Sequence, residues 1–266
     1  MIQNDLLIID SVTKFGDAPQ GRVAIAASHG GVYAGYLAAR AGIRGVILHD
    51  AGIGRNEAGI ASLPYLDDLR IAGATIDYRS ARIGDGAGMA ATGIISHVNE
   101  TARLAGGTVG QLAIETALAM QTAPGGDGPV PKYDEARFVL LETCGRPTVI
   151  GCDSTSLVRP EDVGQIVITA SHGDLLKEAP SWGNRPDVHA AVFNDAGAED
   201  PTRLPDLDTR SIAAATVSTD SARIGDARST YEDGIISHVN ATAQAHGAAQ
   251  GMTCIAFVEL MREISA

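Results

Sequence analysis

Residues 80–85 read SARIGD, and residues 221–226 repeat the same six letters. Residues 93–99 read GIISHVN, and residues 234–240 repeat these seven letters, so both pairs are separated by the same 141 positions (221 − 80 and 234 − 93). Two matches of this length, in one order and at one offset, indicate an internal repeat rather than a coincidence.

Shorter blocks extend the repeat towards the N-terminus of each half. They are ASHG at residues 27–30 and 170–173, DAG at 50–52 and 195–197, and LP-x-LD at 63–67 and 204–208. The segments between the blocks have diverged, so the shared polar blocks mark positions that both halves need. The sequence therefore predicts a tandem duplication, with a first repeat at residues 1–121 and a second at 147–266. Residues 122–146 are predicted to form a Pro/Gly-rich linker followed by a short helix over 134–144.

Short apolar runs alternate with helical patterns in each half, which is typical of a mostly parallel sheet covered by helices. In the first half we expect strands at residues 23–27, 45–48 and 75–78, with a helix over 60–72. The predicted fold is α/β, as two Rossmann-like, mostly parallel β/α halves related by a pseudo-twofold axis.

Composition narrows the functional class. The formal charge is −12 and aromatic residues make up 4% of the chain, which argues against a nucleic-acid partner. No apolar run is long enough to span a membrane, and the N-terminus lacks the pattern of a signal peptide. Three cysteines without a Cys-x-x-Cys pair indicate neither a disulfide framework nor a cysteine zinc site. We expect a cytoplasmic protein, and a homo-oligomer by default.

Nucleotide cofactors are not expected. The glycines at positions 52, 54 and 59 do not fit the Gly-x-Gly-x-x-Gly pattern, and no Walker motif occurs. The sequence therefore predicts no NAD, FAD or ATP.

The repeated polar blocks follow predicted strands, and ligands of open parallel sheets bind at the carboxyl edge. We therefore expect one site between the two repeats. Its candidate catalytic residues are His29, His97, Asp50, Ser28, Ser96, His172, His238 and Asp195.

Neighbouring residues of a strand point to opposite faces, so Ser28 is not expected to pair with His29. The pairs His97 with Ser28, or His29 with Ser96, are more plausible as base and nucleophile, with Asp50 orienting a histidine or taking a proton. Backbone N–H groups of Gly30 and Gly31 could stabilise an oxyanion. The alternative is that Ser28 caps a helix and His29 packs under the loop.

A divalent metal is a second possibility. His29, His97 and Asp50 are the residue types of a two-histidine, one-carboxylate site, and the second half offers the equivalent set. No closely spaced ligand motif supports the assignment.

Substrate binding is predicted for Arg82, Arg223, Gly30, Ser171, Asn99 and Asn240. An arginine shared by both halves suits a small anionic substrate, although an ion pair with Asp85 or Asp226 is an equal alternative. For Asn99 and Asn240, helix N-capping is the default interpretation.

These residues favour a hydrolase that acts on a small carboxylate-bearing amide or cyclic amide. A lyase or isomerase that uses histidine and aspartate for proton transfer is an alternative. So is a non-catalytic protein that binds a small anion. A purely structural role for the repeated blocks also remains open.

Overall fold

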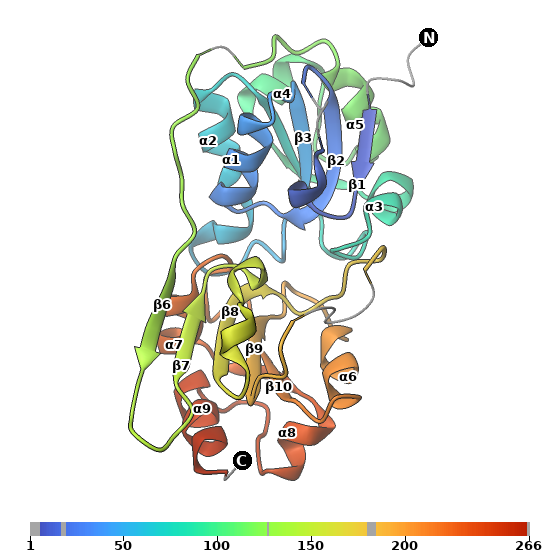
Figure 1. The fold of residues 1–266 in the computed structure, drawn as a ribbon. Coiled ribbons are helices and arrows are strands. Elements are labelled where there is room, and N and C mark those ends of the chain that lie inside the picture. The colour runs from blue at the N-terminus through green and yellow to red at the C-terminus, as the bar shows by residue number, and fades with distance from the viewer. Residues whose placement is uncertain (1–5, 17–19, 127, 180–184, 265–266) are drawn as a thin grey trace. The chain divides into compact units, whose positions relative to one another are not determined.

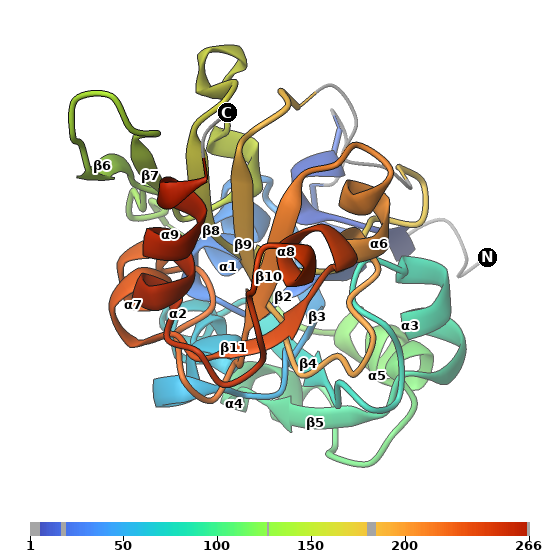
Figure 2. The ribbon, with the colours of Figure 1, turned by 90° about the horizontal axis from the view of Figure 1, so that it is seen from below.

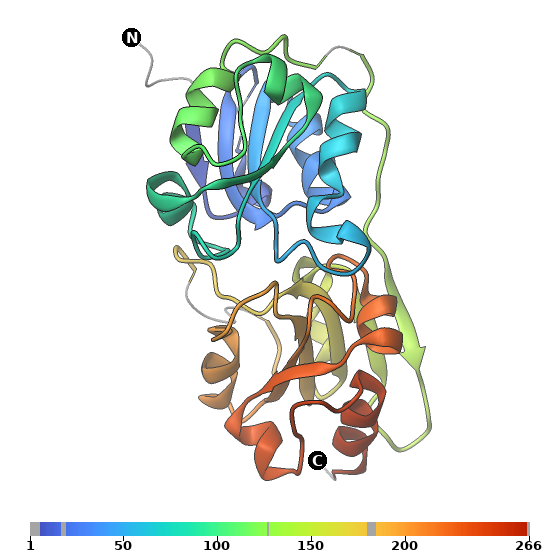
Figure 3. The ribbon, with the colours of Figure 1, turned by 180° about the vertical axis from the view of Figure 1, so that it is seen from behind.

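The computed structural model describes residues 6–16, 20–126, 128–179 and 185–264, and Figures 1 and 3 show the chain from two opposite sides. Contacts within the chain divide it into two compact units. Unit 1 comprises Met1–Ile53, Glu57–Asp134 and Leu176–Glu178. Unit 2 comprises Gly54–Asn56, Glu135–Leu175 and Ala179–Ala266.

Unit 1 is built on a five-stranded sheet in the order β1-β2-β3-β4-β5. The strands are β1 (Leu6–Ile9), β2 (Val23–His29), β3 (Gly45–His49), β4 (Ala72–Ile76) and β5 (Ile95–Val98). The first four strands are parallel, and β5 runs antiparallel to β4. Four parallel neighbours bring four strand ends to one edge of the sheet.

Helices cover both faces of the unit 1 sheet, as Figure 1 shows. They are α1 (Val32–Arg40), α2 (Ser62–Asp68), α3 (Gly86–Thr92), α4 (Glu100–Leu104) and α5 (Ala113–Met120). Residues of α1 and α2 pack on Val46 and Leu48, whereas residues of α3 and α5 pack on Ile47. Alternate residues of β3 therefore enter two separate apolar layers, which is why the strand is buried throughout.

Unit 2 has a six-stranded sheet in the order β11-β10-β9-β8-β7-β6. The strands are β6 (Arg137–Leu141), β7 (Val149–Cys152), β8 (Ile166–His172), β9 (Ala190–Asn194), β10 (Ala213–Val217) and β11 (Ile236–Val239). The central four are parallel, and the two edge strands are antiparallel to their neighbours. Figure 2 shows its helices α6 (Arg203–Asp208), α7 (Ala227–Asp233), α8 (Ala241–Ala245) and α9 (Cys254–Glu263).

The two units are similar, and the predicted α/β class with mostly parallel sheets is confirmed. They differ after β8, where the described residues hold no counterpart of α1. Phe193 occupies the position of Leu48, and the guanidinium of Arg203 lies 5.0 Å from the centre of the Phe193 ring. The Arg203 guanidinium thus covers a face of the larger ring in unit 2. No helix among the described residues is long and apolar enough to cross a bilayer.

Two local expectations were wrong. Residues 134–144 do not form a helix, because Arg137–Leu141 pairs as β6 with β7, and its Phe138 and Val139 favour a strand. The helix expected over 60–72 ends at Asp68, since Ala72–Ile76 forms buried strand β4. The last strand of each half is antiparallel to its neighbour, which agrees with the prediction of a mostly parallel sheet.

Candidate functional site

Four polar residues lie at the carboxyl edge of the unit 1 sheet. His29 ends β2 and His49 ends β3. Asp50 follows β3 directly, and Asp77 follows β4. The parallel arrangement of β2, β3 and β4 accounts for their gathering at this edge.

Asp50 is a buried carboxyl group, 2% exposed. Its Oδ1 accepts hydrogen bonds from the backbone N–H groups of Gly52 and Tyr78, both at 3.0 Å. Burial raises the pKa of Asp50, and the charge of Asp77 acts in the same direction. The two N–H donors and the hydroxyl of Ser96 oppose the increase without cancelling it. Asp50 is thus the carboxyl at this edge that retains a proton more readily than an ordinary aspartate.

Asp77 has the opposite electrostatic setting. Arg79 donates from Nε to Oδ1 at 2.9 Å and from Nη2 to Oδ2 at 2.5 Å. This bidentate pair lowers the pKa of Asp77. Two carboxyl groups at consecutive strand ends therefore have pKa values shifted apart, a pattern that in enzymes separates a proton carrier from a fixed charge.

The Ser96 hydroxyl lies beside Asp50. Its Oγ is 3.1 Å from Oγ1 of Thr75 and donates to the Thr75 carbonyl at 3.2 Å. Unit 2 repeats the arrangement with Ser237 and Thr216 at 2.9 Å. The expected pair of His29 with Ser96 is not among the hydrogen bonds of the described residues.

His29 is neutral and its basic nitrogen is occupied. The backbone N–H of Gly31 donates to Nδ1 at 3.2 Å, and burial lowers the pKa of His29 to about 4. A neutral imidazole that accepts at Nδ1 carries its proton on Nε2, a tautomer assigned from this network. His29 can therefore donate a hydrogen bond through Nε2, but in this tautomer it is not the expected general base.

The other histidines of the repeated blocks lie on separate strands. His97 is on edge strand β5, and its buried Nδ1 has no hydrogen-bond partner among the described residues. In unit 2, Nδ1 of His238 is 3.1 Å from Oγ1 of Thr216. His172 ends β8 opposite Asn194 and is 8% exposed. None of the three is hydrogen-bonded to Ser28 or Ser171 in the described part of the chain.

The expected oxyanion donors are already engaged. Gly30 donates its N–H to the carbonyl of His49 at 2.8 Å, and Gly31 donates to His29. A Cβ at Gly30 would lie 2.4 Å from the carbonyl oxygen of Gly59, so this glycine is required by a close approach of two backbones. The N–H groups of Gly30 and Gly31, expected as oxyanion donors, are therefore engaged within the protein.

Ser28 and Ser171 anchor the backbone of the first loop in each unit. The Ser28 hydroxyl accepts from the N–H of Val12 at 3.1 Å, and Ser171 accepts from Thr155 at 2.8 Å. Neither hydroxyl has a general base as a partner in the described residues. The helix-capping alternative for Ser28 was also wrong, because α1 begins after Gly31 with no side-chain cap. Both serines hold a short 3-10 turn in place.

Asn99 and Asn240 cap helices, as the default interpretation predicted. Oδ1 of Asn99 accepts from Gly73 and Ala102 at 2.9 Å each, and Nδ2 donates to the Ile71 carbonyl at 2.8 Å. Asn240 makes the equivalent bonds in unit 2. Both side chains are buried and their polar atoms are engaged with the backbone.

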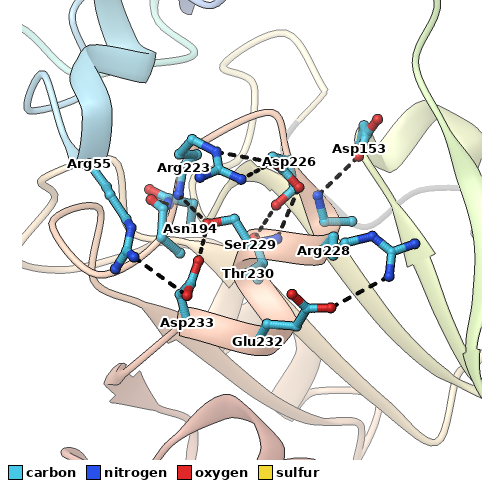
Figure 4. Close-up of polar contacts among 12 residues, drawn as sticks. Arg55, Asp153, Asn194, Arg223, Asp226, Arg228, Ser229, Thr230, Glu232 and Asp233 are labelled. Carbon is cyan, nitrogen blue, oxygen red and sulfur yellow. Dashed lines mark hydrogen bonds and ion pairs between the residues drawn. The ribbon is translucent and has the colours of Figure 1, made fainter.

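Arg223 forms the ion pair that was the alternative to anion binding. Figure 4 shows its guanidinium on Asp226, with Nη2 2.6 Å and Nε 3.1 Å from the same oxygen. The pair is partly exposed, and Asp226 also caps α7 through the N–H of Ser229. The corresponding Arg82 is exposed.

Unit 2 reproduces the first carboxyl of the edge but not the second. Oδ1 of Asp195 accepts from the N–H groups of Gly197 and Thr219 at 3.0 Å each, as Asp50 does in unit 1. Ser218, however, occupies the position of Asp77. The pair of carboxyl groups at consecutive strand ends is therefore a property of unit 1.

The expected metal ligands do not form a ligand set. Within residues 6–264, apart from the undescribed positions, no group of three or more His, Cys, Asp or Glu side chains could hold a metal ion. His29 ends β2, Asp50 follows β3 and His97 lies within β5, so the three residues come from different strands.

Asp77, Arg79 and Thr75 were missed from the sequence. Thr75 recurs as Thr216 and could have been found from the repeat. Asp77 and Arg79 correspond to Ser218 and Asp220, so a search for shared residues passes over them.

Comparison of the chain with models of protein families, with characterised proteins and with solved structures found no match.

Proposed function

We propose that the carboxyl edge of unit 1 is the active site of a hydrolase that acts on a small carboxylate-bearing amide or cyclic amide. The observation that carries the proposal is the pair Asp50 and Asp77, which follow consecutive strands and have pKa values shifted in opposite directions. Two neighbouring carboxyl groups whose pKa values are shifted apart are typical of active sites in which one group transfers a proton and the other stays ionised. Water is assigned as the nucleophile, because the Ser28 hydroxyl anchors Val12 and the Ser96 hydroxyl donates to the Thr75 carbonyl.

Asp50 would transfer the proton in both halves of the reaction. As a carboxylate it would accept a proton from the attacking water while the water oxygen bonds to the amide carbon. As a carboxylic acid it would return that proton to the leaving nitrogen as the carbon–nitrogen bond breaks. A raised pKa suits this double role, because the same group must accept and release a proton near neutral pH.

The neighbouring groups would bind and orient the substrate. Burial raises the pKa of Asp50, and Asp77, held ionised by Arg79, would add a smaller contribution through its fixed negative charge. The Nε2–H of His29 is the candidate donor to the substrate carbonyl. Exposed Arg82 is the candidate partner for the substrate carboxylate, since guanidinium groups bind carboxylates in a bidentate manner.

A lyase or isomerase is the second candidate. It is favoured by the same carboxyl pair, since proton transfer between carbon positions needs a base of raised pKa but neither water nor a nucleophile. Oxygen incorporation from ¹⁸O-labelled water identifies the hydrolase. Deuterium incorporation at carbon in D₂O identifies the lyase or isomerase.

The test is a turnover screen, followed by NMR, with N-acyl amino acids, monoamides of dicarboxylic acids and lactam carboxylates. Asp50→Asn should lower kcat by about 10²–10⁴-fold, the usual contribution of a general acid–base group. Asp195→Asn is the matched control, because Asp195 makes the same two backbone hydrogen bonds in unit 2. Equal loss in both variants, or none in Asp50→Asn, would refute the role of Asp50. Binding of these compounds without turnover would instead favour the non-catalytic anion-binding alternative.

A further inference from the structure

Asp153 joins the start of β6 to the rest of unit 2. Asp153 follows β7, and its Oδ2 accepts a hydrogen bond from the N–H of Ala136 at 2.7 Å. The backbone N–H of Asp153 donates to the carbonyl of Ala136 at 3.0 Å. Its Oδ1 accepts from the N–H of Ala227, the first residue of α7, at 3.0 Å. The carboxylate of Asp153 is therefore fixed by two backbone donors, one of which begins the pairing of β6 with β7.

Glu135 places a second carboxyl group beside Asp153. It follows Asp134, where the chain passes from unit 1 into unit 2, and its side chain is half-buried. The hydroxyl of Ser154 is its hydrogen-bond partner. Burial raises the pKa of Glu135 to about 7, the negative charge of Asp153 acts in the same direction, and the Ser154 hydroxyl opposes both. Two carboxyl groups thus adjoin the residue pair that fixes the start of β6.

No ion pair with a cation neutralises Glu135 in the described part of the chain. The charged side chains of the neighbouring segments are paired with one another: Lys132 with Asp134 before β6, Arg137 of β6 with Asp162, and Arg223 with Asp226 and Arg228 with Glu232 around α7. An ionised Glu135 therefore faces the charge of Asp153 without compensation.

Unit 1 has a lysine at the corresponding place. Asp10 corresponds to Asp153, and its Oδ2 accepts from the N–H of Glu178 at 2.8 Å. The carboxylate of Glu178 accepts from Nζ of Lys14 at 3.0 Å. In unit 2, Leu157 occupies the position of Lys14. The acidic residue beside the repeated aspartate is thus neutralised in unit 1 and uncompensated in unit 2.

We propose that Glu135 is a pH-sensitive switch that keeps the start of β6 paired with Asp153 when protonated and weakens this pairing when ionised. A protonated carboxyl adds no charge beside Asp153, whereas a carboxylate repels it and is better solvated in the open state. Opening of the pair lengthens the free part of the linker that follows α5. The switch belongs to unit 2 and uses none of the residues assigned to proton transfer in unit 1.

The direction of the pH dependence follows from the environment of Glu135. The folded state binds the proton more tightly than an ordinary glutamate with a pKa of 4.5. The pairing is therefore strongest below pH 4.5 and weakens as the pH rises through about 7.

Amide hydrogen exchange measured by NMR tests the switch at the N–H groups of Ala136 and Asp153. After correction for intrinsic exchange rates, we expect their protection factors to fall about three- to tenfold between pH 6 and pH 8. The upper value corresponds to the full change in the pKa of Glu135, and the lower one allows for solvent screening of a half-buried group. Protection factors that do not change between these pH values would overturn the proposal.

Two variants assign the effect to Glu135. Glu135→Gln keeps the size of the side chain and cannot ionise, so protection should become independent of pH and stay close to the wild-type value at pH 6. Glu142→Gln is the matched control, because Glu142 is an exposed glutamate directly after the other end of β6, and it should keep the wild-type pH dependence. A pH dependence that persists in Glu135→Gln, or that disappears in Glu142→Gln, would also overturn the proposal.

Discussion

His49 and Asn194 occupy corresponding positions at the ends of β3 and β9 and make the same two hydrogen bonds. His49 accepts from the N–H of Ala51 at 3.0 Å and contacts the Ala81 carbonyl through Nε2 at 3.0 Å. Asn194 accepts from Ala196 at 2.9 Å and donates to Ala222 at 3.2 Å. The two side chains present one acceptor and one donor with equivalent spacing, so His49 is a neutral structural residue.

The replacement His49→Asn should therefore be tolerated. We expect the free energy of unfolding at pH 7 to change by less than about 1 kcal/mol, because both hydrogen bonds can be kept. His49→Ala should cost about 2–4 kcal/mol, since it leaves a buried N–H and a buried carbonyl without partners. Urea denaturation of the two variants measures the difference, and equal losses would show that the asparagine does not reproduce the histidine contacts.

The same residue should give unfolding a characteristic pH dependence. Burial lowers the pKa of His49 to about 4 from 6.5, so the folded state disfavours the protonated ring. Its contribution to stability is complete above pH 6.5 and is lost as the pH falls towards 4. The wild type should lose up to about 3 kcal/mol more than His49→Asn between pH 7 and pH 4. Parallel stability curves for the two proteins would contradict this expectation.

Asp50→Asn should stabilise unit 1 while it removes activity. Because burial raises the pKa of Asp50, ionisation costs stability as the pH rises through the ordinary aspartate value of 3.8 and beyond. Asparagine keeps an oxygen for the N–H groups of Gly52 and Tyr78 and carries no charge. We expect a Tm at pH 7 that is equal to or higher than that of the wild type. A large fall in Tm would show that the carboxylate charge is needed for folding.

Ser28→Ala should lower stability without lowering turnover. The change leaves the N–H of Val12 without the acceptor at 3.1 Å, which should cost about 1–2 kcal/mol. Ser171→Ala, the equivalent change in unit 2, should have a similar cost. If Ser28→Ala instead abolished turnover in a folded protein, a nucleophilic serine would have to be reconsidered.

Asn99 should be among the least replaceable polar residues. Its side chain accepts from the N–H groups of Gly73 and Ala102 and donates to the Ile71 carbonyl. Asn99→Ala therefore leaves these three backbone groups without a side-chain partner. We expect a loss of about 2–4 kcal/mol. Asn99→Asp, which keeps only the acceptor, should still be strongly destabilised, and urea denaturation of both variants checks this order.

The alternation of apolar runs and helical patterns predicted the α/β class, and the repeated asparagines were expected to cap helices, but the repeat favoured residues that have structural contacts. Residues shared by two diverged halves are those that both units need, and these are mainly backbone anchors such as Ser28, Gly30 and Asn99. Asp77 and Arg79 have no equivalent in unit 2, so comparison of the halves could not find them. Side-chain burial and hydrogen bonding, which decide the pKa of Asp50, depend on packing that no sequence pattern specifies.

The most direct test of the proposed role of Asp50 is a pH titration of the aspartate side-chain carboxyl carbons by ¹³C NMR, with Asp50→Asn and Asp77→Asn to assign the signals. We predict that Asp50 titrates above the ordinary value of 3.8 and Asp77 below it. In Asp77→Asn, the pKa of Asp50 should fall, because a neighbouring negative charge has been removed. A titration of Asp50 at or below 3.8 in the wild-type protein would contradict its assignment as the proton carrier of the site.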